Sequence, residues 1–123
     1  MEKTTQPVSI RTDESGNPIG VRIQTLDVDF TIALHDACNH DLNVDEARAL
    51  GQAPTKKQAS IICAYLDEIQ EAMEKAGGDR LDGWYVTCAD YNANYTWYFI
   101  SPYGCVINYN RFIHYFRSRP VLA

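Results

Sequence analysis

The residues best suited to chemistry lie together in the segment HDACNH (35–40). His35, Cys38 and His40 bring imidazole and thiol groups into one short stretch. A zinc centre needs four such ligands in tetrahedral geometry, usually held by further hydrogen bonds, and no obvious partner pair occurs elsewhere in the chain. We therefore interpret the segment as a loop whose Asp36 and histidines cap the following helix. A small metal- or thiol-dependent enzyme that uses this loop is the alternative.

The four cysteines are spread singly along the chain and form no CxxC pair. We interpret Cys38, Cys63, Cys88 and Cys105 as mostly buried free thiols, with one disulfide as the alternative. A nucleophilic thiol needs an imidazole beside it, and His114 could approach Cys88 or Cys105. No GxGxxG, P-loop, GxSxG or HExxH motif is present. The sequence predicts a protein that is not an enzyme and that holds no metal or cofactor.

Aromatic residues are concentrated in the segment 91–116. It holds ten of the fourteen aromatic residues and four asparagines, and with histidine neutral its only charge is Arg111. Because side chains alternate along a strand, Trp97, Phe99 and Val106 can face the core while their neighbours face outward. Exposed tyrosines mixed with asparagine are typical of antibody paratopes, since tyrosine offers rigid contact area and asparagine adapts its hydrogen bonds. The segment therefore predicts a binding surface within residues 86–117.

The predicted contact residues are aromatic anchors and polar hydrogen-bonding partners. They are Tyr91, Asn92, Asn94, Tyr95, Tyr98, Tyr103, Asn108, Tyr109, Asn110, Phe112 and His114. The supporting scaffold is expected to comprise Ile62, Leu66, Ile69, Trp97 and the closing RPVLA.

Composition and charge indicate one folded domain over residues 1–123. The chain is 46% apolar and 22% charged, typical of a globular protein. Residues 1–90 carry 16 acids against 8 bases, whereas residues 91–123 carry three arginines and no acid. An acidic body argues against a nucleic-acid binder. The N-terminus lacks the apolar stretch of a signal peptide, no segment is apolar enough to insert into a membrane, and residues 1–18 are expected to be partly flexible.

The elements that must position these residues form an α+β pattern. Segments 20–25 and 28–34 alternate as strands do. Asn43 with Glu46, and Thr55 with Gln58, have the capping-box spacing of helix starts. The second helix is expected to run from Thr55 to the stop at Gly77-Gly78, with an apolar stripe at Ile62, Leu66, Ile69, Met73 and Ala76. From Trp84 onward every segment is predicted to be strand, so two helices should pack on a mainly antiparallel, twisted sheet.

Five segments of the chain follow a pattern found in a known family. They are FTIALHDA (30–37), APTKKQASIICAYLDEI (53–69), AGGDRLDGWY (76–85), YTWYFISPYGCV (95–106) and RPVLA (119–123). Here the chain resembles small gut-Bacteroidetes and phage proteins that end in a C-type-lectin-like module related to the formylglycine-generating-enzyme sheet. It departs from them at 85–89, where Val86 replaces the usual second aromatic residue.

The resemblance implies a C-type-lectin-like fold that displays a binding surface. Some members of the group are variable proteins of diversity-generating retroelements, whose NNC codons never specify Lys, Glu, Gln, Met or Trp. Residues 85–123 contain no Lys, Glu, Gln or Met, whereas residues 1–84 contain 17. The implied setting is a phage tail or bacterial surface, with a cell-surface protein or glycan as partner. The calcium-binding lectin motifs EPN, QPD and WND are absent, so no calcium is expected. A structural fibre subunit is a further alternative.

Overall fold

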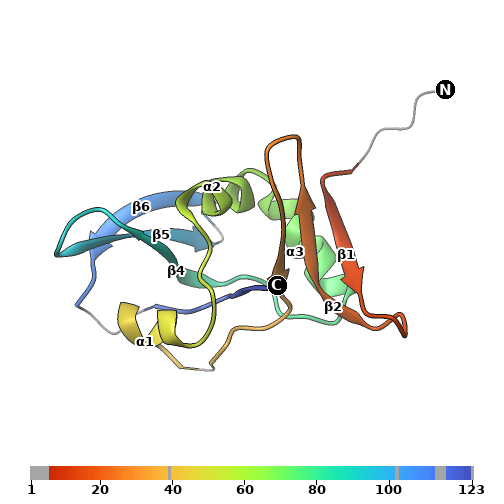
Figure 1. Ribbon diagram of the computed structural model, residues 1–123, viewed down its shortest axis with the longest axis horizontal. Helices are drawn as coiled ribbons and strands as arrows, with labels where there is room; N and C mark the ends of the chain where they lie inside the picture. The colour runs from red at the N-terminus through yellow and green to blue at the C-terminus, as the bar shows by residue number, and fades with distance from the viewer. Residues whose placement is uncertain (1–5, 39, 102, 113–115, 123) are drawn as a thin grey trace.

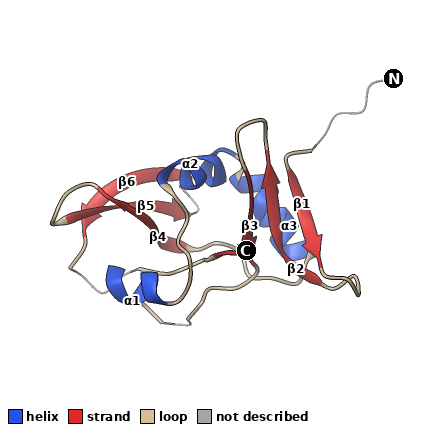
Figure 2. Ribbon diagram, in the orientation of Figure 1, coloured by secondary structure: helices blue, strands red, loops and turns tan. Residues whose placement is uncertain are grey.

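The computed structural model describes residues 6–38, 40–101, 103–112 and 116–122. Over these residues the chain has an α+β fold with helices packed against antiparallel sheets (Figures 1 and 2). The α+β class predicted from the sequence is confirmed. The described part contains two sheets rather than one, and three helices rather than two.

The first sheet is formed mainly by the N-terminal third of the chain. Its strand order is β1-β2-β3-β7, and each neighbouring pair is antiparallel. The strands are β1 (Val8–Thr12), β2 (Pro18–Gln24), β3 (Asp29–Ala33) and β7 (Val121–Leu122). The two predicted strands at 20–25 and 28–34 thus correspond to β2 and β3. Strand β1 falls in the segment expected to be partly flexible, and it forms one edge of the sheet.

The second sheet carries most of the aromatic segment. It is an antiparallel meander of β4 (Gly83–Asp90), β5 (Tyr95–Ser101) and β6 (Cys105–Asn110). In Figure 1 it lies on the left, with the β4–β5 turn at its outer end. The closing segment, predicted as a strand, is mostly irregular. It makes isolated bridges at Phe116 and Arg117 before the short β7.

The three helices are α1 (Val44–Ala49), α2 (Lys56–Ala64) and α3 (Leu66–Lys75). Both predicted capping boxes are confirmed, at Asn43 for α1 and at Thr55 for α2. The predicted single helix from Thr55 is wrong in one respect, because it breaks at Tyr65 (φ −114°, ψ 26°) into α2 and α3. The apolar stripe nevertheless stays buried through Ile62, Leu66, Ile69 and Met73. The chain leaves α3 at Gly77, where φ is +79° as glycine permits.

Strand β5 is buried on both faces, and this organises the whole core. Phe99 and Tyr85 belong to the larger cluster, which fills the space between α2, α3 and the sheets. Tyr98 and Val86 belong to a second cluster, formed with α1 and Phe116 on the opposite face. Alternation along β4 and β5 sends successive side chains to opposite faces. The β4-β5-β6 sheet is therefore held between helices on both sides and offers a rigid frame.

Arg119 joins the closing segment to the middle of the chain. Its side chain is fully buried. The Nε donates to Asp36 Oδ1 at 2.9 Å, and Nη1 donates to the carbonyl oxygens of Leu34 at 3.0 Å and Asp79 at 2.9 Å. Nη2 donates to the carbonyl of Arg80 at 3.3 Å. One guanidinium thus binds the partly buried Asp36 carboxylate and several loop carbonyls, as its fixed array of donors allows.

Candidate ligand-binding surface

The candidate site lies where the β4–β5 turn meets the end of β6. Tyr95 at the start of β5 is directly opposite Asn110 at the end of β6. The N–H of Arg111 donates to the carbonyl oxygen of Asn94 at 3.0 Å. These contacts bring residues 91–95 and 109–112 together at the outer end of the sheet (Figure 1, left).

Four large aromatic side chains are exposed at this end. Relative exposure is 57% for Tyr91, 42% for Tyr95, 45% for Tyr109 and 66% for Phe112. Asn92, Asn94 and Asn110 are exposed beside them. We call this set the hairpin-end surface: Tyr91, Asn92, Asn94, Tyr95, Tyr109, Asn110 and Phe112. All seven were among the residues predicted from the sequence to contact a ligand.

The hairpin-end surface extends over both faces of the sheet. Tyr95 lies on the same face as Trp97 by strand alternation, and the ring of Tyr91 meets Trp97 edge-on with centroids 5.6 Å apart. Tyr109 lies on the other face, where its ring meets Trp84 edge-on at 5.2 Å. A ligand flat against one face cannot reach both Tyr95 and Tyr109. The geometry suits a ligand that wraps around the end of the sheet, or a ligand with a recess into which the end of the sheet inserts.

Two asparagine side chains shape the backbone at this end. Asn92 Oδ1 accepts the N–H groups of Asn94 and Tyr95 at 2.9 and 3.0 Å, and Asn110 Oδ1 accepts the N–H of Phe112 at 2.7 Å. Their side-chain amide nitrogens make no hydrogen bond within the described part of the chain and are therefore available as donors. The predicted role of these asparagines is thus refined: they fix the turns with the oxygen and offer the nitrogen outward.

The Asp90 carboxylate fastens the hairpin end to the rest of the molecule. Oδ1 accepts from Thr96 Oγ1 at 2.8 Å and from Arg48 Nη2 of α1 at 3.0 Å, and Oδ2 lies 3.3 Å from Arg111 Nη1. Burial raises the pKa of Asp90, but hydrogen bonds from Thr96 and Arg48 and the charges of Arg48 and Arg111 outweigh it, so the pKa lies below its ordinary value. Arg111 also reaches Asp45 of α1 at 2.9 Å. These ion pairs and hydrogen bonds therefore hold the turn that carries the exposed aromatic residues in a fixed position.

Replacing Asp90 with asparagine is expected to lower the free energy of unfolding at neutral pH by about 1 kcal/mol, because the lost ion pairs are partly exposed to solvent. Since the pKa of Asp90 is lower in the native than in the unfolded chain, its carboxylate adds stability above about pH 4, and this contribution is lost as the pH falls through the native pKa. The loss of stability on acidification should therefore be smaller in Asp90→Asn. Urea unfolding at neutral and acidic pH measures both effects. An Asp45→Asn control with the same response would contradict a special role for Asp90.

Three predicted contact residues do not join this surface. Tyr98 is fully buried, stacked on Phe116 with centroids 4.1 Å apart, so its prediction as an exposed contact residue is wrong. Tyr103 is 82% exposed but lies in the β5–β6 turn beside Leu66, at the opposite end of the sheet. Asn108 is half-buried opposite Trp97, at the margin of the hairpin-end surface. The predicted His114 lies outside the described residues.

The HDACNH loop has a structural role. His35 Nδ1 lies 2.9 Å from Asp79 Oδ2, and Asp36 accepts from Arg119 and Arg117. The cap of α1 is Asn43, so the prediction that Asp36 and the histidines cap this helix is wrong. Among the described residues no group of three or more His, Cys, Asp or Glu side chains could hold a metal ion.

The cysteines are free thiols in the structure. The prediction that they are mostly buried is wrong, because Cys88 and Cys105 are exposed and Cys38 and Cys63 are half-buried. Burial, together with the nearby Cys105, raises the pKa of Cys63 to about 11. Cys63 is therefore protonated at neutral pH and poorly suited to nucleophilic attack.

Sequence reasoning did not identify several residues that build the hairpin end. Asp90, Arg48 and Lys56 belong to β4, the last turn of α1 and the first turn of α2, and each resembles an ordinary surface charge in sequence. Lys56 Nζ lies 3.7 Å from the centroid of the Trp97 ring, a cation–π contact. Only the long-range pairing of these elements reveals such roles. No helix in the described part of the chain is long and apolar enough to cross a membrane.

Comparisons with protein-family models, with curated proteins and with solved structures found no match to this chain. Support for a function must therefore come from the composition, exposure and placement of its own side chains. The hairpin-end surface gathers four aromatic side chains that stay 42–66% exposed, which makes it the candidate site.

Proposed function

We propose that this protein is a ligand- or receptor-binding protein that uses the hairpin-end surface to bind a cell-surface protein or glycan. The observation that carries the proposal is the exposure of Tyr91, Tyr95, Tyr109 and Phe112 at one end of a braced sheet. Isolated exposed apolar residues are common on soluble proteins, but a gathered group, rimmed by polar residues, is characteristic of interaction sites.

The chemistry of the surface supports recognition by contact. Tyrosine and phenylalanine provide large areas at the cost of few rotatable bonds, and aromatic residues dominate the energetic centres of interfaces. The amide groups of Asn92, Asn94 and Asn110 supply hydrogen bonds around them. Tyrosine rings also present apolar faces and a hydroxyl group, which suits both peptide and sugar surfaces. The surface contains no charged side chain, so its specificity would come from shape and hydrogen bonding.

The C-type-lectin-like scaffold and its diversification belong to the same proposal. The α+β arrangement of helices against antiparallel sheets is compatible with that scaffold. Strand β5 carries both buried aromatic residues, Tyr98 and Phe99, and the exposed Tyr95, which is compatible with a fixed frame that displays variable contact residues. All seven residues of the hairpin-end surface are of types that NNC codons specify. Such a protein would act on a phage tail or a bacterial surface.

The proposal can be tested with an array that carries bacterial surface glycans and outer-surface proteins. The purified chain should bind a subset of the spots, and the double variant Tyr95→Ala/Phe112→Ala should lose that binding by more than about tenfold, because truncating even one hot-spot aromatic residue costs about 2 kcal/mol or more. A suitable control is Leu26→Ala, since Leu26 is fully exposed in the β2–β3 turn of the other sheet. Equal binding by the double variant would refute the proposal. So would an obligate oligomer that buries the hairpin-end surface, which would instead favour a fibre subunit.

A further inference from the structure

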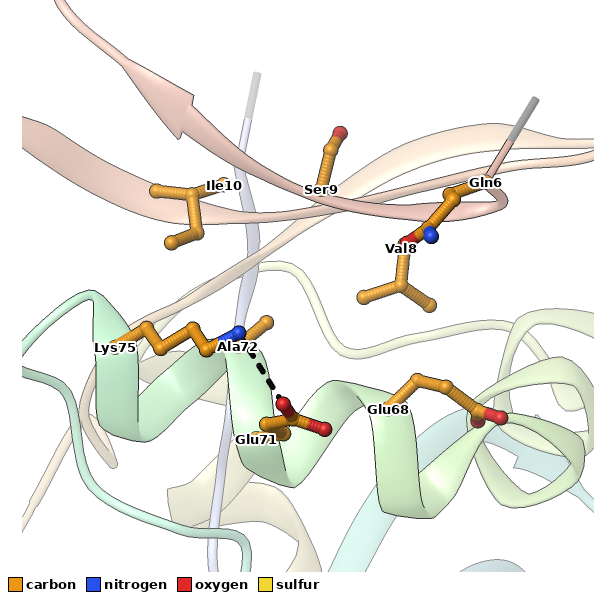
Figure 3. A pocket seen from close by; sticks show the side chains of 8 residues that line it. All are labelled: Gln6, Val8, Ser9, Ile10, Glu68, Glu71, Ala72 and Lys75. Atoms are coloured by element: carbon orange, nitrogen blue, oxygen red, sulfur yellow. Dashed lines mark ion pairs between the residues drawn. The ribbon is translucent and has the colours of Figure 1, made fainter. Parts of the chain in front are cut away.

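A groove separates the edge strand β1 from helix α3, far from the hairpin-end surface. It has a volume of about 240 Å³ and is lined by Gln6, Val8, Ser9, Ile10, Glu68, Glu71, Ala72 and Lys75. Figure 3 shows Val8 and Ile10 pointing from β1 toward the helix, with Ala72 between the acidic residues and Lys75. The floor is therefore apolar and the helical side of the rim is charged.

On the side of this groove the backbone of β1 has no strand partner among the described residues. The N–H of Gln24 donates to the carbonyl of Pro7 at 2.8 Å, and Val8 is directly opposite Ile23 in the antiparallel register. Hydrogen-bonded and non-hydrogen-bonded pairs alternate in such a ladder, so the N–H and C=O groups of Val8 and Ile10 point away from β2. No described residue pairs with them. These groups form a template that can accept one more strand.

The charges on the rim indicate which strand would fit. Glu71 forms an exposed ion pair with Lys75 at 3.1 Å, whereas Glu68 makes no ion pair with any described residue. The exposed side of α3 also carries Asp67 and Glu74, so the helix is acidic overall. A second copy paired through its own β1 would continue the sheet and place two acidic α3 helices side by side. Like charges at that distance disfavour the arrangement and favour a basic partner.

We propose that the open edge of β1 binds an extended peptide segment of another protein by strand addition. The segment would carry one apolar side chain that enters the groove over Val8, Ile10 and Ala72. On the side away from Lys75, a lysine or arginine on the same face would pair with Glu68 and Glu71. Backbone hydrogen bonds would supply affinity and the alternating side chains specificity, as in other strand-addition complexes. This site is separate from the hairpin-end surface and does not depend on its function.

The test uses the full chain and the probe peptide acetyl-Lys-Thr-Val-Thr-Lys-amide, whose lysines and valine share one face of a strand, so that one lysine can reach Glu68 in either strand direction. At millimolar peptide, amide NMR signals of Val8 and Ile10 should shift and their hydrogen exchange should slow, together with shifts at Ala72. Glu68→Gln should weaken binding by about two- to fivefold, as expected for an exposed charge pair. Asp67→Asn removes a charge from the same helix but outside the groove, so it should weaken binding less than Glu68→Gln does.

Three outcomes would overturn the proposal. The first is the absence of any response at Val8 and Ile10. The second is an equal response to acetyl-Glu-Thr-Val-Thr-Glu-amide, because charge would then play no part. The third is a dimer, detected by analytical ultracentrifugation, in which the Val8 and Ile10 amides are protected from exchange without peptide. That result would show that a second copy of the chain occupies the β1 edge.

Discussion

Replacing Arg119 with methionine is expected to lower the free energy of unfolding by about 3–5 kcal/mol, because one partner of a buried ion pair is removed. Asp36, which is only 15% exposed, would lose its 2.9 Å bond to the Nε of Arg119. The carbonyl oxygen of Asp79 would lose this donor as well, whereas that of Leu34 would keep the N–H of Asp79 at 2.8 Å. The lost hydrogen bonds add to the cost. Urea unfolding followed by tryptophan fluorescence measures the change.

Substitution by lysine separates charge from geometry at this position. Arg119→Lys keeps the positive charge, but a single ammonium group cannot replace the planar array of donors, so most of the destabilisation should remain. Arg117 is the matched control, since it also contacts Asp36 but its side chain is 34% exposed. Arg117→Lys should cost less than about 1 kcal/mol. Equal effects of the two lysine substitutions would show that the buried network around Arg119 adds nothing special.

Replacing Tyr98 with alanine is expected to lower the free energy of unfolding by about 3–5 kcal/mol, as for other large core aromatic residues. Tyr98 stacks on Phe116 and contacts Trp84, with ring centroids 4.1 and 6.0 Å away. Its hydroxyl donates to the carbonyl oxygen of Asn110 at 3.1 Å, and burial raises its pKa to about 12. Tyr98→Phe should therefore cost only about 1 kcal/mol for the lost hydrogen bond.

Tyr95 is the natural comparison, because it lies on the same strand and is exposed. Tyr95→Ala should change stability by no more than about 0.5 kcal/mol, although we expect it to weaken ligand binding. Thermal unfolding of the two alanine variants side by side would show this contrast. Similar destabilisation by both substitutions would mean that Tyr95 supports the fold rather than a ligand.

Local signals in the sequence predicted the helix starts and the apolar stripe well. Asn43 and Thr55 cap their helices by hydrogen bonds that reach only three residues along the chain, and such interactions are visible in sequence spacing. Ile62, Ile69 and Met73 recur at helical spacing and are fully buried, so their burial could be predicted from the periodicity of the sequence. The strands β2 to β6 also follow from alternation and turn residues.

Features that depend on distant partners could not be predicted. Strand β1 has only Val8 and Ile10 directed inward and is defined by its pairing with β2. The break at Tyr65 leaves the apolar spacing intact, so periodicity does not reveal it. Tyr98 was expected to be exposed because one covered face was assumed, whereas α1 and Phe116 cover the second face. Alternation predicts that side chains face opposite sides, but not what covers each side.

The structure divides the aromatic segment between two roles. Tyr98, Phe99 and Phe116 are fully or almost fully buried and, with Tyr85 of β4, hold the sheet between its helices. Tyr91, Tyr95, Tyr109 and Phe112 remain exposed at the end of that sheet. Asp90 fixes the position of the end through Thr96, Arg48 and Arg111. A rigid frame under exposed aromatic side chains reduces the entropy lost on binding.

The most direct test of this account is a single-residue substitution library of residues 85–122, displayed on yeast and sorted separately for display level and for binding to a surface protein or glycan that the array identifies. Display level reports folding, because unstable proteins are degraded before export. We predict that substitutions at Tyr91, Tyr95, Tyr109 and Phe112 preserve display but abolish binding. Substitutions at Arg119, and those at Tyr98 other than phenylalanine, should lose both. Binding that survives every displayed substitution of the hairpin-end surface would contradict the account.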